Sequence, residues 1–267
     1  MKKIQRALIS VSNKNNLKFL IKNLNKFNIK LISSGGTYKE IKKMGFSCEQ
    51  ISKYTSSSEI LSGRVKTLHP KIHAGILADR NLKSHKKDLK RNNYNEIDLI
   101  VVNFYPFENT IAKTTNHRKI IENIDIGGPT MVRAAAKNYS NVTVITNISQ
   151  YENLIKNIEA NKGATSTEFR KQVALEAFGE TAYYESLIYN YFNQFCKNEF
   201  PRKMVIGFNL IEKLRYGENP HQSGSIYTLS KNLGLEKLNG KHLSYNNYAD
   251  IFSAIQISRT FPKRRGT

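Results

Sequence analysis

The chain has 267 residues, with 42 Lys and Arg against 21 Asp and Glu, so its formal net charge is +21 and its calculated isoelectric point is near 9.8. This length provides one large domain or two ordinary ones with a sufficient core, and it excludes a mini-protein that depends on disulfides or metals. Hydrophobic residues make up 39% of the chain, which is typical of a globular protein, and no apolar run reaches the roughly 18 residues that a membrane-spanning helix needs.

The predicted elements alternate between strands and helices. Runs of β-branched residues predict strands, and apolar residues three and four positions apart predict helices. The expected strands cover residues 6–11, 29–32, 97–104 and 142–145. The expected helices cover residues 17–27, 38–44, 129–138, 150–160 and 166–196. This alternation needs crossover connections, so it predicts a doubly wound, mostly parallel α/β sheet.

A break at residues 198–201 (NEFP) predicts a domain boundary. Beyond it, the sequence predicts a strand over residues 204–210, a stretch rich in Gly and Asn, and a basic end at residues 262–267. Only Cys48 and Cys196 are present, far apart, so neither a disulfide framework nor a thiolate metal site is expected.

The excess positive charge is compatible with nucleic-acid binding, because Lys and Arg neutralise phosphates. The lysines are scattered, however, and accompany many Asn and Ile residues, as a coding bias toward A and T would leave. The densest run, residues 83–91, is typical of a solvated helix face, and no zinc-finger or RNP motif is present. The sequence therefore predicts no nucleic-acid partner. Without a signal-peptide core, it also predicts a cytoplasmic protein with no membrane partner.

A glycine pair lies between a predicted strand and a predicted helix, in residues 33–37 (SSGGT). Glycines let the backbone approach an anion closely, and a helix N-terminus offers free N–H groups and a favourable dipole. The turn suits one phosphate group, although it matches neither the Walker loop nor the dinucleotide-binding fingerprint. A tight turn with a threonine cap is the alternative.

Residues 64–70 (RVKTLHP) bring a guanidinium, an ammonium, a hydroxyl and an imidazole close together. Arg binds phosphate as a fork and Lys as a point charge, so this segment predicts one side of a pocket; a solvated basic loop is the alternative. His69 and His73 have the spacing of a helical metal site. Pro70 separates them and no catalytic Glu accompanies them, so no metal site is predicted.

Two further segments place polar groups near the expected carboxyl edge of the sheet. Asn103 and Tyr105 follow a strand at the edge where open α/β sheets bind ligands, although this aromatic segment (NFYPF) is also suited to closing the end of the sheet. Asp125 precedes a predicted helix that carries Lys137, and the two are a candidate acid–base pair across a ligand. A surface lysine on an alanine-rich helix is the alternative.

Together these segments resemble one family, the bifunctional purine-biosynthesis enzyme that combines IMP cyclohydrolase with AICAR transformylase. Order and spacing agree from residue 1 to about residue 255. The matching stretches are SVSNK (10–14), SGGT (34–37), GRVKTLHP (63–70), HAGIL (73–77), NFYPF (103–107), IDIGG (124–128), RAAAKN (133–138), LRYGENPHQ (214–222) and LSYNN (243–247).

The resemblance implies that residues 1–199 form a cyclohydrolase domain similar to methylglyoxal synthase. This domain would close the purine ring of 5-formamidoimidazole-4-carboxamide ribotide, with loss of water, to give IMP. The resemblance further implies a small-molecule nucleotide substrate, no metal or organic cofactor for ring closure, and it allows a homodimer. Residues 200–267 would be a truncated start of the transformylase domain.

The resemblance also assigns roles to residues. The catalytic set is Lys137, Lys66, Tyr105 and Asp125. The substrate-binding set is Ser12, Asn13, Lys14, Ser34, Gly35, Gly36, Thr37, Arg64, Val65, Thr67, Asn103, Ile126 and Gly127. Asn13 departs from the family pattern, which usually has Asp at this position.

In the second part of the chain, Arg215 and Tyr216 correspond to residues that contact the AICAR nucleotide in the family. The segment of the Lys-His-Asn-Pro-Cys-Gly type that is expected next, with its catalytic histidine, does not follow. We therefore expect ring closure without formyl transfer from 10-formyltetrahydrofolate, as from a truncated or frameshifted gene. The alternative function is a regulatory methylglyoxal-synthase-like module that binds a phosphorylated effector without turnover.

Overall fold

The computed structural model describes residues 2–229 and 232–261, and the basic end predicted at residues 262–267 lies outside this part of the chain. The chain divides into two compact units, Met1–Arg202 and Lys203–Thr267. Among the described residues, no helix combines the length and the apolar character needed to cross a membrane.

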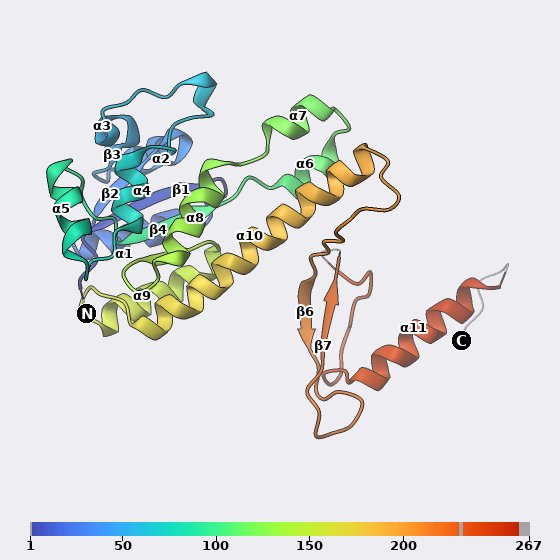
Figure 1. The fold of residues 1–267 in the computed structure, drawn as a ribbon. Coiled ribbons are helices and arrows are strands. Elements are labelled where there is room, and N and C mark those ends of the chain that lie inside the picture. The colour runs from blue at the N-terminus through green and yellow to red at the C-terminus, as the bar shows by residue number, and fades with distance from the viewer. Residues whose placement is uncertain (1, 230–231, 262–267) are drawn as a thin grey trace. The chain divides into compact units, whose positions relative to one another are not determined.

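A five-stranded parallel sheet forms the centre of the first unit (Figure 1), in the order β3-β2-β1-β4-β5. The strands are β1 (Arg6–Val11), β2 (Lys30–Ser33), β3 (Glu49–Gln50), β4 (Leu99–Asn103) and β5 (Thr143–Ile145). All four neighbouring pairs are parallel, and the predicted α/β sheet is therefore confirmed. The central β1 pairs with both β2 and β4, so the carboxyl ends of three strands meet at one edge.

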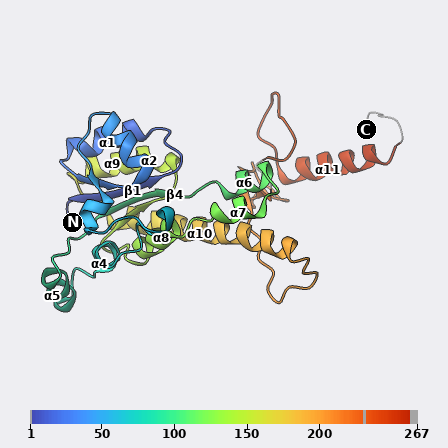
Figure 2. The ribbon, with the colours of Figure 1, turned by 90° about the horizontal axis from the view of Figure 1, so that it is seen from above.

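Helices cover both faces of this sheet. They are α1 (Leu17–Lys26), α2 (Gly35–Lys43), α3 (Ile51–Thr55), α4 (Pro70–Leu77), α5 (Lys83–Arg91), α6 (Phe107–Lys113), α7 (His117–Glu122), α8 (Gly127–Lys137), α9 (Tyr151–Ala160) and α10 (Thr167–Phe195), with short 3-10 turns at Leu61–Gly63 and Ile148–Gln150. Figure 2 shows α1, α2 and α9 on one face and α4, α8 and α10 on the other. The crossover helices before β3, α1 and α2, therefore share one face, and α4 and α8, from the crossovers between β3 and β5, share the other.

The core lies between the sheet and these helical layers. Leu8 and Ile9 on β1 are fully buried although they point to opposite faces, as a doubly covered parallel strand requires. On α8, the alanines at positions 134–136 are buried and keep the helix thin, so that it packs closely against β4, β5 and α10. Each fully buried Leu or Ile contributes about 1.5–3 kcal/mol through burial of apolar surface.

Two helices begin earlier than their sequences predict. The turn at residues 35–37 is the first turn of α2, since the predicted start at residue 38 lies one turn inside the helix. Helix α8 begins at Gly127 rather than at Pro129, because the Asp125 carboxylate accepts the N–H of Gly128 at 2.9 Å and caps the first turn. In both helices the glycines therefore present N–H groups of a helix N-terminus.

The second unit contains an antiparallel pair, β6 (Asn209–Lys213) and β7 (Ser225–Thr228), and a helix, α11 (Tyr245–Arg259). The predicted strand over residues 204–210 is wrong in its position, because pairing with β7 begins only at Asn209. An apolar run is not sufficient for a strand, since the backbone also needs a partner for its hydrogen bonds. Helix α11 contains no buried residue.

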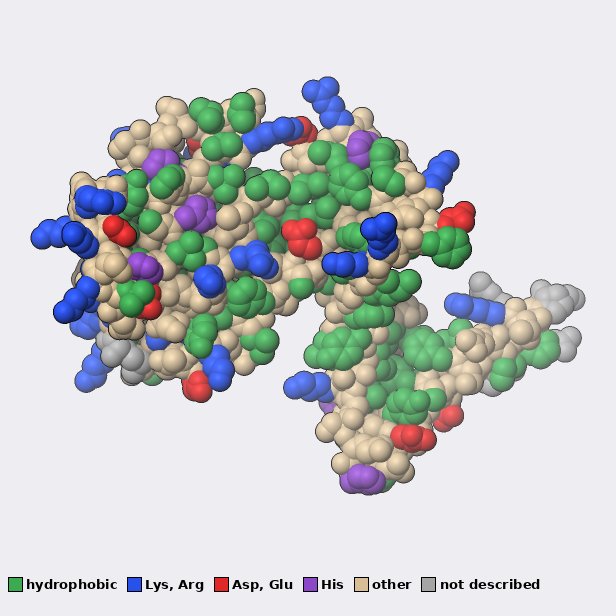
Figure 3. All heavy atoms as spheres, in the orientation of Figure 1, with side chains coloured by type: hydrophobic (Ala, Val, Ile, Leu, Met, Phe, Trp, Pro, Cys, Tyr) green, Lys and Arg blue, Asp and Glu red, His purple; other side chains and the backbone are tan. Residues whose placement is uncertain are grey.

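Lys and Arg side chains are spread over the face of the first unit that Figure 3 shows, and they do not gather in one patch. On α5, residues 83–91 form a helix in which only Leu89 is buried, as predicted for a solvated helix face.

Candidate active site

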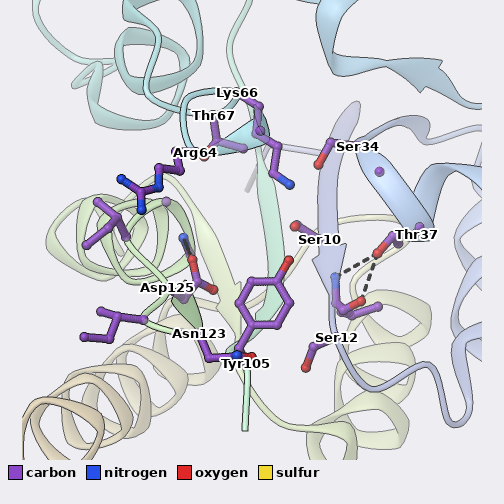
Figure 4. Close-up of a pocket in the computed structure, with 18 of the residues that line it drawn as sticks. Ser10, Ser12, Ser34, Thr37, Arg64, Lys66, Thr67, Tyr105, Asn123 and Asp125 are labelled. Atoms are coloured by element: carbon purple, nitrogen blue, oxygen red, sulfur yellow. Dashed lines mark hydrogen bonds between the residues drawn. The ribbon is translucent and has the colours of Figure 1, made fainter. Parts of the chain in front are cut away.

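A cavity of about 950 Å³ opens at the carboxyl edge of the sheet in the first unit. Its walls follow the ends of β1, β2 and β4, and the rest comes from the loop before α4, from α7 and from the start of α8. Figure 4 shows side chains from these separate segments pointing into one space. The strand order creates this meeting point, because β1 lies between β2 and β4.

One end of the cavity is suited to an anion. Gly35 and Gly36 begin α2, and Gly35 has φ +51°, a conformation that favours glycine. A Cβ on Gly35 would lie 4.0 Å from Lys66 Nζ, and a Cβ on Gly36 would lie 3.7 Å from Lys14 Nζ. The N–H groups of the first helical turn and two ammonium groups therefore converge where a phosphate group would be stabilised.

The hydroxyl of Thr37 does not face this space as a free group. Its Oγ1 accepts the N–H of Val11 at 3.1 Å and donates to the carbonyl oxygen of Val11 at 2.9 Å, within a buried contact. Thr37 therefore attaches the start of α2 to the end of β1. This bond fixes the distance between the two segments that line the anionic end.

Asn103 holds the loop that follows β1. Its Oδ1 accepts the N–H groups of Ser12 and Asn13 at 2.6 and 3.0 Å, and its Nδ2 donates to the carbonyl oxygen of Asn13 at 3.1 Å. Ser12 Oγ donates to the carbonyl oxygen of Phe104 at 2.7 Å. The amide of Asn103 thus bonds to protein groups and orients the segment that carries Lys14.

Asp125 lies on the opposite wall, in the loop between α7 and α8. Its Oδ1 accepts the N–H of Gly128, and its own N–H donates to the hydroxyl of Tyr184 at 2.8 Å. Burial raises the pKa of the Asp125 carboxyl, while the Gly128 N–H and the positive charge of Lys66 act in the opposite direction. An acid with a raised pKa near an ammonium group is suited to proton transfer in a cleft.

Tyr105 and Ile126 offer apolar surface within the same cavity. Tyr105 is 46% exposed and Ile126 is 58% exposed, although both line the cavity. Figure 4 shows the Tyr105 ring between Asp125 on one side of the cavity and Ser12 on the other. These two side chains are suited to packing against a planar ligand.

An ion pair between Arg64 and Glu122 lies at the rim. Arg64 comes from the loop before α4 and Glu122 from the end of α7. Both side chains are largely exposed, so their attraction contributes only about 0–1 kcal/mol. A ligand anion could displace Glu122 from Arg64 at a small energetic cost.

The structure brings most of the predicted site residues to this one cavity. The predicted residues that line it are Ser12, Lys14, Ser34, Gly35, Gly36, Thr37, Arg64, Lys66, Thr67, Asn103, Tyr105, Asp125, Ile126 and Gly127. Asn13, Val65 and Lys137 are not part of the lining. Val65 forms a bridge with Ile60, and Lys137 is exposed at the last position of α8. Lys137 is therefore outside the lining of this cavity, and its pairing with Asp125 across a ligand stays a prediction.

Sequence reasoning missed several lining residues. They are Ser10, Val11, Glu59, Ser62, Gly63, Ile121, Glu122, Asn123, Ile124, Gly128 and Met131. Several of them are neighbours in sequence of residues that were predicted, so the sequence could have indicated them. Glu122 had no such signal, because its partner Arg64 is 58 positions away.

Replacing Gly128 with alanine is expected to lower activity at this site by about 10-fold, since small misplacements of a reacting group have effects of this size. A Cβ there would lie 2.4 Å from Asp125 Oδ2, so the carboxylate must move. Gly179→Ala on α10 is the matched control, because nothing lies within 4 Å of its Cβ position. Steady-state kinetics and thermal unfolding of both variants check this. Unchanged kinetics for Gly128→Ala would show that the position of the carboxylate is unimportant.

Arg215 and Tyr216 lie in the second unit, away from these residues in sequence. The Arg215 guanidinium lies 4.8 Å from the centre of the Tyr216 ring and donates to its hydroxyl at 3.0 Å. Arg215 also lines a separate cavity of about 450 Å³ within that unit. In the part of the chain that the structure describes, no group of three His, Cys, Asp or Glu side chains is arranged to hold a metal ion.

Two family models match the chain. One, described as "MGS-like domain", matches residues 16–130, and the other, described as "AICARFT/IMPCHase bienzyme", matches residues 135–266. A solved structure described as "Crystal structure of ForH" has a TM-score of 0.64 and 28% sequence identity, and the match covers 71% of this chain and 97% of that one.

Three curated relatives carry the name "Bifunctional purine biosynthesis protein PurH". Those from Bradyrhizobium diazoefficiens, Thermoanaerobacter sp. and Prochlorococcus marinus are 42%, 45% and 47% identical to this chain, over 99%, 96% and 96% of its length. The matches cover 51%, 51% and 49% of the relatives. The chain thus spans about half the length of the curated relatives it matches.

The parallel sheet and the polar cavity at its carboxyl edge define the first unit as an α/β domain of the methylglyoxal-synthase-like class. The two family models and the relatives narrow this further. The chain belongs to the AICARFT/IMPCHase family of bifunctional purine-biosynthesis proteins.

Proposed function

We propose that the first unit is an IMP cyclohydrolase, which closes the ring of 5-formamidoimidazole-4-carboxamide ribotide with loss of water. One observation carries this proposal. A single cavity combines a helix N-terminus and two ammonium groups at one end with a partly buried carboxyl and an exposed aromatic ring at the other. A ribonucleotide has the matching pair of ends, a phosphate and a planar base.

The chemistry needs a stronger nucleophile and a better leaving group. The carboxamide nitrogen attacks the formyl carbon, a C–N bond forms, and the formyl oxygen gains negative charge. Lys66 stabilises that oxygen, and Asp125 accepts a proton from the nitrogen, with Tyr105 in support. Lys66 and the protonated Asp125 each give a proton to the oxygen, which departs as water, and the formamido nitrogen then loses its proton to the neutral Lys66, which completes the aromatic ring. No electron is transferred, so the step needs no redox cofactor, and the proposal assigns the proton transfers to side chains alone.

The decisive test is spectrophotometric. The 267-residue chain is mixed with the formylated ribotide, with and without a chelator, and the absorbance of the purine product is followed. Formation of IMP at the same rate in both samples supports the proposal. Tight binding of the ribotide without conversion would instead support the regulatory module, and no binding would exclude both.

Lys137 provides a separate prediction. The resemblance assigns proton transfer to this lysine, yet its side chain is not part of the cavity lining. If Lys137 transfers a proton as the resemblance implies, Lys137→Ala should lower kcat while the affinity for IMP stays within about 2-fold, because binding contacts come from lining residues. Lys14→Ala is the control and should weaken IMP binding by about 10-fold, since it removes a charge-assisted contact. Calorimetric titration measures both affinities, and a large loss of affinity in Lys137→Ala would show that Lys137 reaches the ligand.

Formyl transfer from 10-formyltetrahydrofolate is not part of this proposed activity. The segment of the Lys-His-Asn-Pro-Cys-Gly type does not occur in the 267 residues, although Arg215 and Tyr216 do. We therefore propose that these residues alone do not use 10-formyltetrahydrofolate. Formylation of AICAR by the purified chain would contradict this.

A further inference from the structure

Tyr184 contacts the loop that carries Asp125, although it is 59 positions away on α10. Its side chain is buried, with 5% exposure. Its hydroxyl accepts the N–H of Asp125 at 2.8 Å and lies 3.5 Å from the carbonyl oxygen of Asn123. Asn123 and Asp125 both line the cavity, so one buried hydroxyl bonds to the backbone of that wall.

The Asp125 residue is fixed at two points as a result. Tyr184 holds its backbone N–H, and the N–H of Gly128 holds Oδ1 of its side chain. Among the described residues, Oδ2 has no hydrogen-bond partner in the protein, so it is the oxygen available to a ligand. A carboxylate fixed at two points keeps one orientation, which general acid–base catalysis requires.

The ring of Tyr184 also supports the neighbouring wall. It packs against Phe104 with ring centres 5.0 Å apart and against the edge of Phe107 at 6.2 Å. These two phenylalanines flank Tyr105 in the sequence, and Tyr105 lines the cavity. The Tyr184 side chain therefore contacts two segments that line the cavity. Its hydroxyl bonds to the loop that carries Asp125, and its ring packs against the segment that carries Tyr105.

The hydroxyl of Tyr184 keeps its proton at neutral pH. Burial raises its pKa to about 12, and the negative charges of Asp125 and Glu185 act in the same direction, while the bond to the Asp125 N–H lowers it. A protonated hydroxyl accepts from one backbone group and donates to another. The bonds to Asp125 and Asn123 are thus compatible with each other throughout the pH range of an enzyme assay.

From these contacts we infer that Tyr184 is a positioning residue, which holds the Asp125 carboxylate in the geometry needed for ring closure. The inference rests on the proposed function. Tyr184 itself does not line the cavity, so it acts through Asp125 and not on the ligand. This inference predicts that loss of the Tyr184 hydroxyl alone, with the ring retained, impairs ring closure.

The test is Tyr184→Phe, which keeps the packing against Phe104 and Phe107. We expect kcat to fall by about 10-fold with KM within about 2-fold, because binding groups stay in place while a reacting group moves. The control is Tyr191→Phe, two turns further along α10. It removes a hydrogen bond of similar length, 2.7 Å to His117, that does not involve the cavity. Its kcat should match the wild type.

The pH profile separates positioning from a merely structural role. In the wild type, the groups that face Asp125 are Lys66, the Gly128 N–H and the Tyr184 hydroxyl, and burial leaves the pKa of the carboxyl raised. Without the Tyr184 bond the loop is less constrained and the carboxyl is more hydrated, so its pKa should fall toward the ordinary value. Activity that needs the ionised carboxylate is then lost at a lower pH than in the wild type.

A direct titration of the Asp125 carboxyl by ¹³C NMR, assigned with Asp125→Asn, makes the inference independent of turnover. A lower pKa in Tyr184→Phe and an unchanged one in Tyr191→Phe would support it. The same pKa in all three proteins would overturn it, even if ring closure is observed. If the wild type shows no ring closure, the proposed function fails, while the titration still decides whether Tyr184 positions the carboxylate.

Discussion

Replacement of Lys66 with alanine should reduce kcat for ring closure by about 10²- to 10³-fold, the effect of removing one donor that stabilises a developing oxyanion. Lys66 lies close both to Gly35 at the anionic end and to Asp125, on whose pKa its charge acts. Loss of that charge should raise the pKa of Asp125 further. The ionised carboxylate is then protonated at a higher pH than in the wild type. On the acidic side of a pH–rate profile, the activity of the variant should therefore begin to fall at a higher pH than that of the wild type.

Lys71→Ala is the matched control for this variant. It removes the same charge from the same stretch of chain, but Lys71 lies 4.9 Å from the centre of the Tyr54 ring and does not line the cavity. Its kinetics should equal those of the wild type. Equal losses in both variants would mean that Lys66 contributes through net charge and not through its place in the site.

Replacement of Asp98 with alanine should lower the free energy of unfolding by about 3–5 kcal/mol, the usual effect of removing one partner of a buried ion pair. Asp98 is 4% exposed, and its Oδ1 lies 2.7 Å from Arg80 Nη1. That contact lacks hydrogen-bond geometry, so it is an attraction of charges. Its Oδ2 accepts the N–H groups of Gln5 and Arg6 at 2.8 and 2.9 Å, which fixes the start of β1.

Urea unfolding measures this loss, and Asp88→Ala is the control. Asp88 pairs with Arg91 at 3.5 Å on α5, where both side chains are more than half exposed. An exposed helical pair of this kind contributes about 0.3–0.5 kcal/mol. If the two variants were equally stable, the buried Asp98 carboxylate, with its bonds to the start of β1 and to Arg80, would contribute no more than an exposed one.

The motifs that carry the family resemblance include most of the residues that line the cavity, because backbone geometry restricts which residues can stand at several of these positions. Gly35 is favoured by its positive φ, and Gly127 by close approach, since a Cβ on Gly127 would lie 2.2 Å from Thr67 Oγ1. Such requirements leave short, recognisable strings of residues. Lys137 shows what such a motif cannot predict. The sequence of the motif places the lysine on a helix, but it does not show toward which side of the helix the side chain points.

The sequence by itself determined four of the five strands of the sheet, their parallel arrangement and the segments that carry polar groups, because these depend on local periodicity and on turns; the two-residue β3 was not predicted. Only the tertiary structure decided which of those groups share a space. Tyr184 with Asp125, Arg64 with Glu122 and Arg80 with Asp98 are brought together by strand order and by the packing of α10 across the sheet. Contacts between residues 18 to 59 positions apart leave no periodic trace, so local sequence could not reveal them.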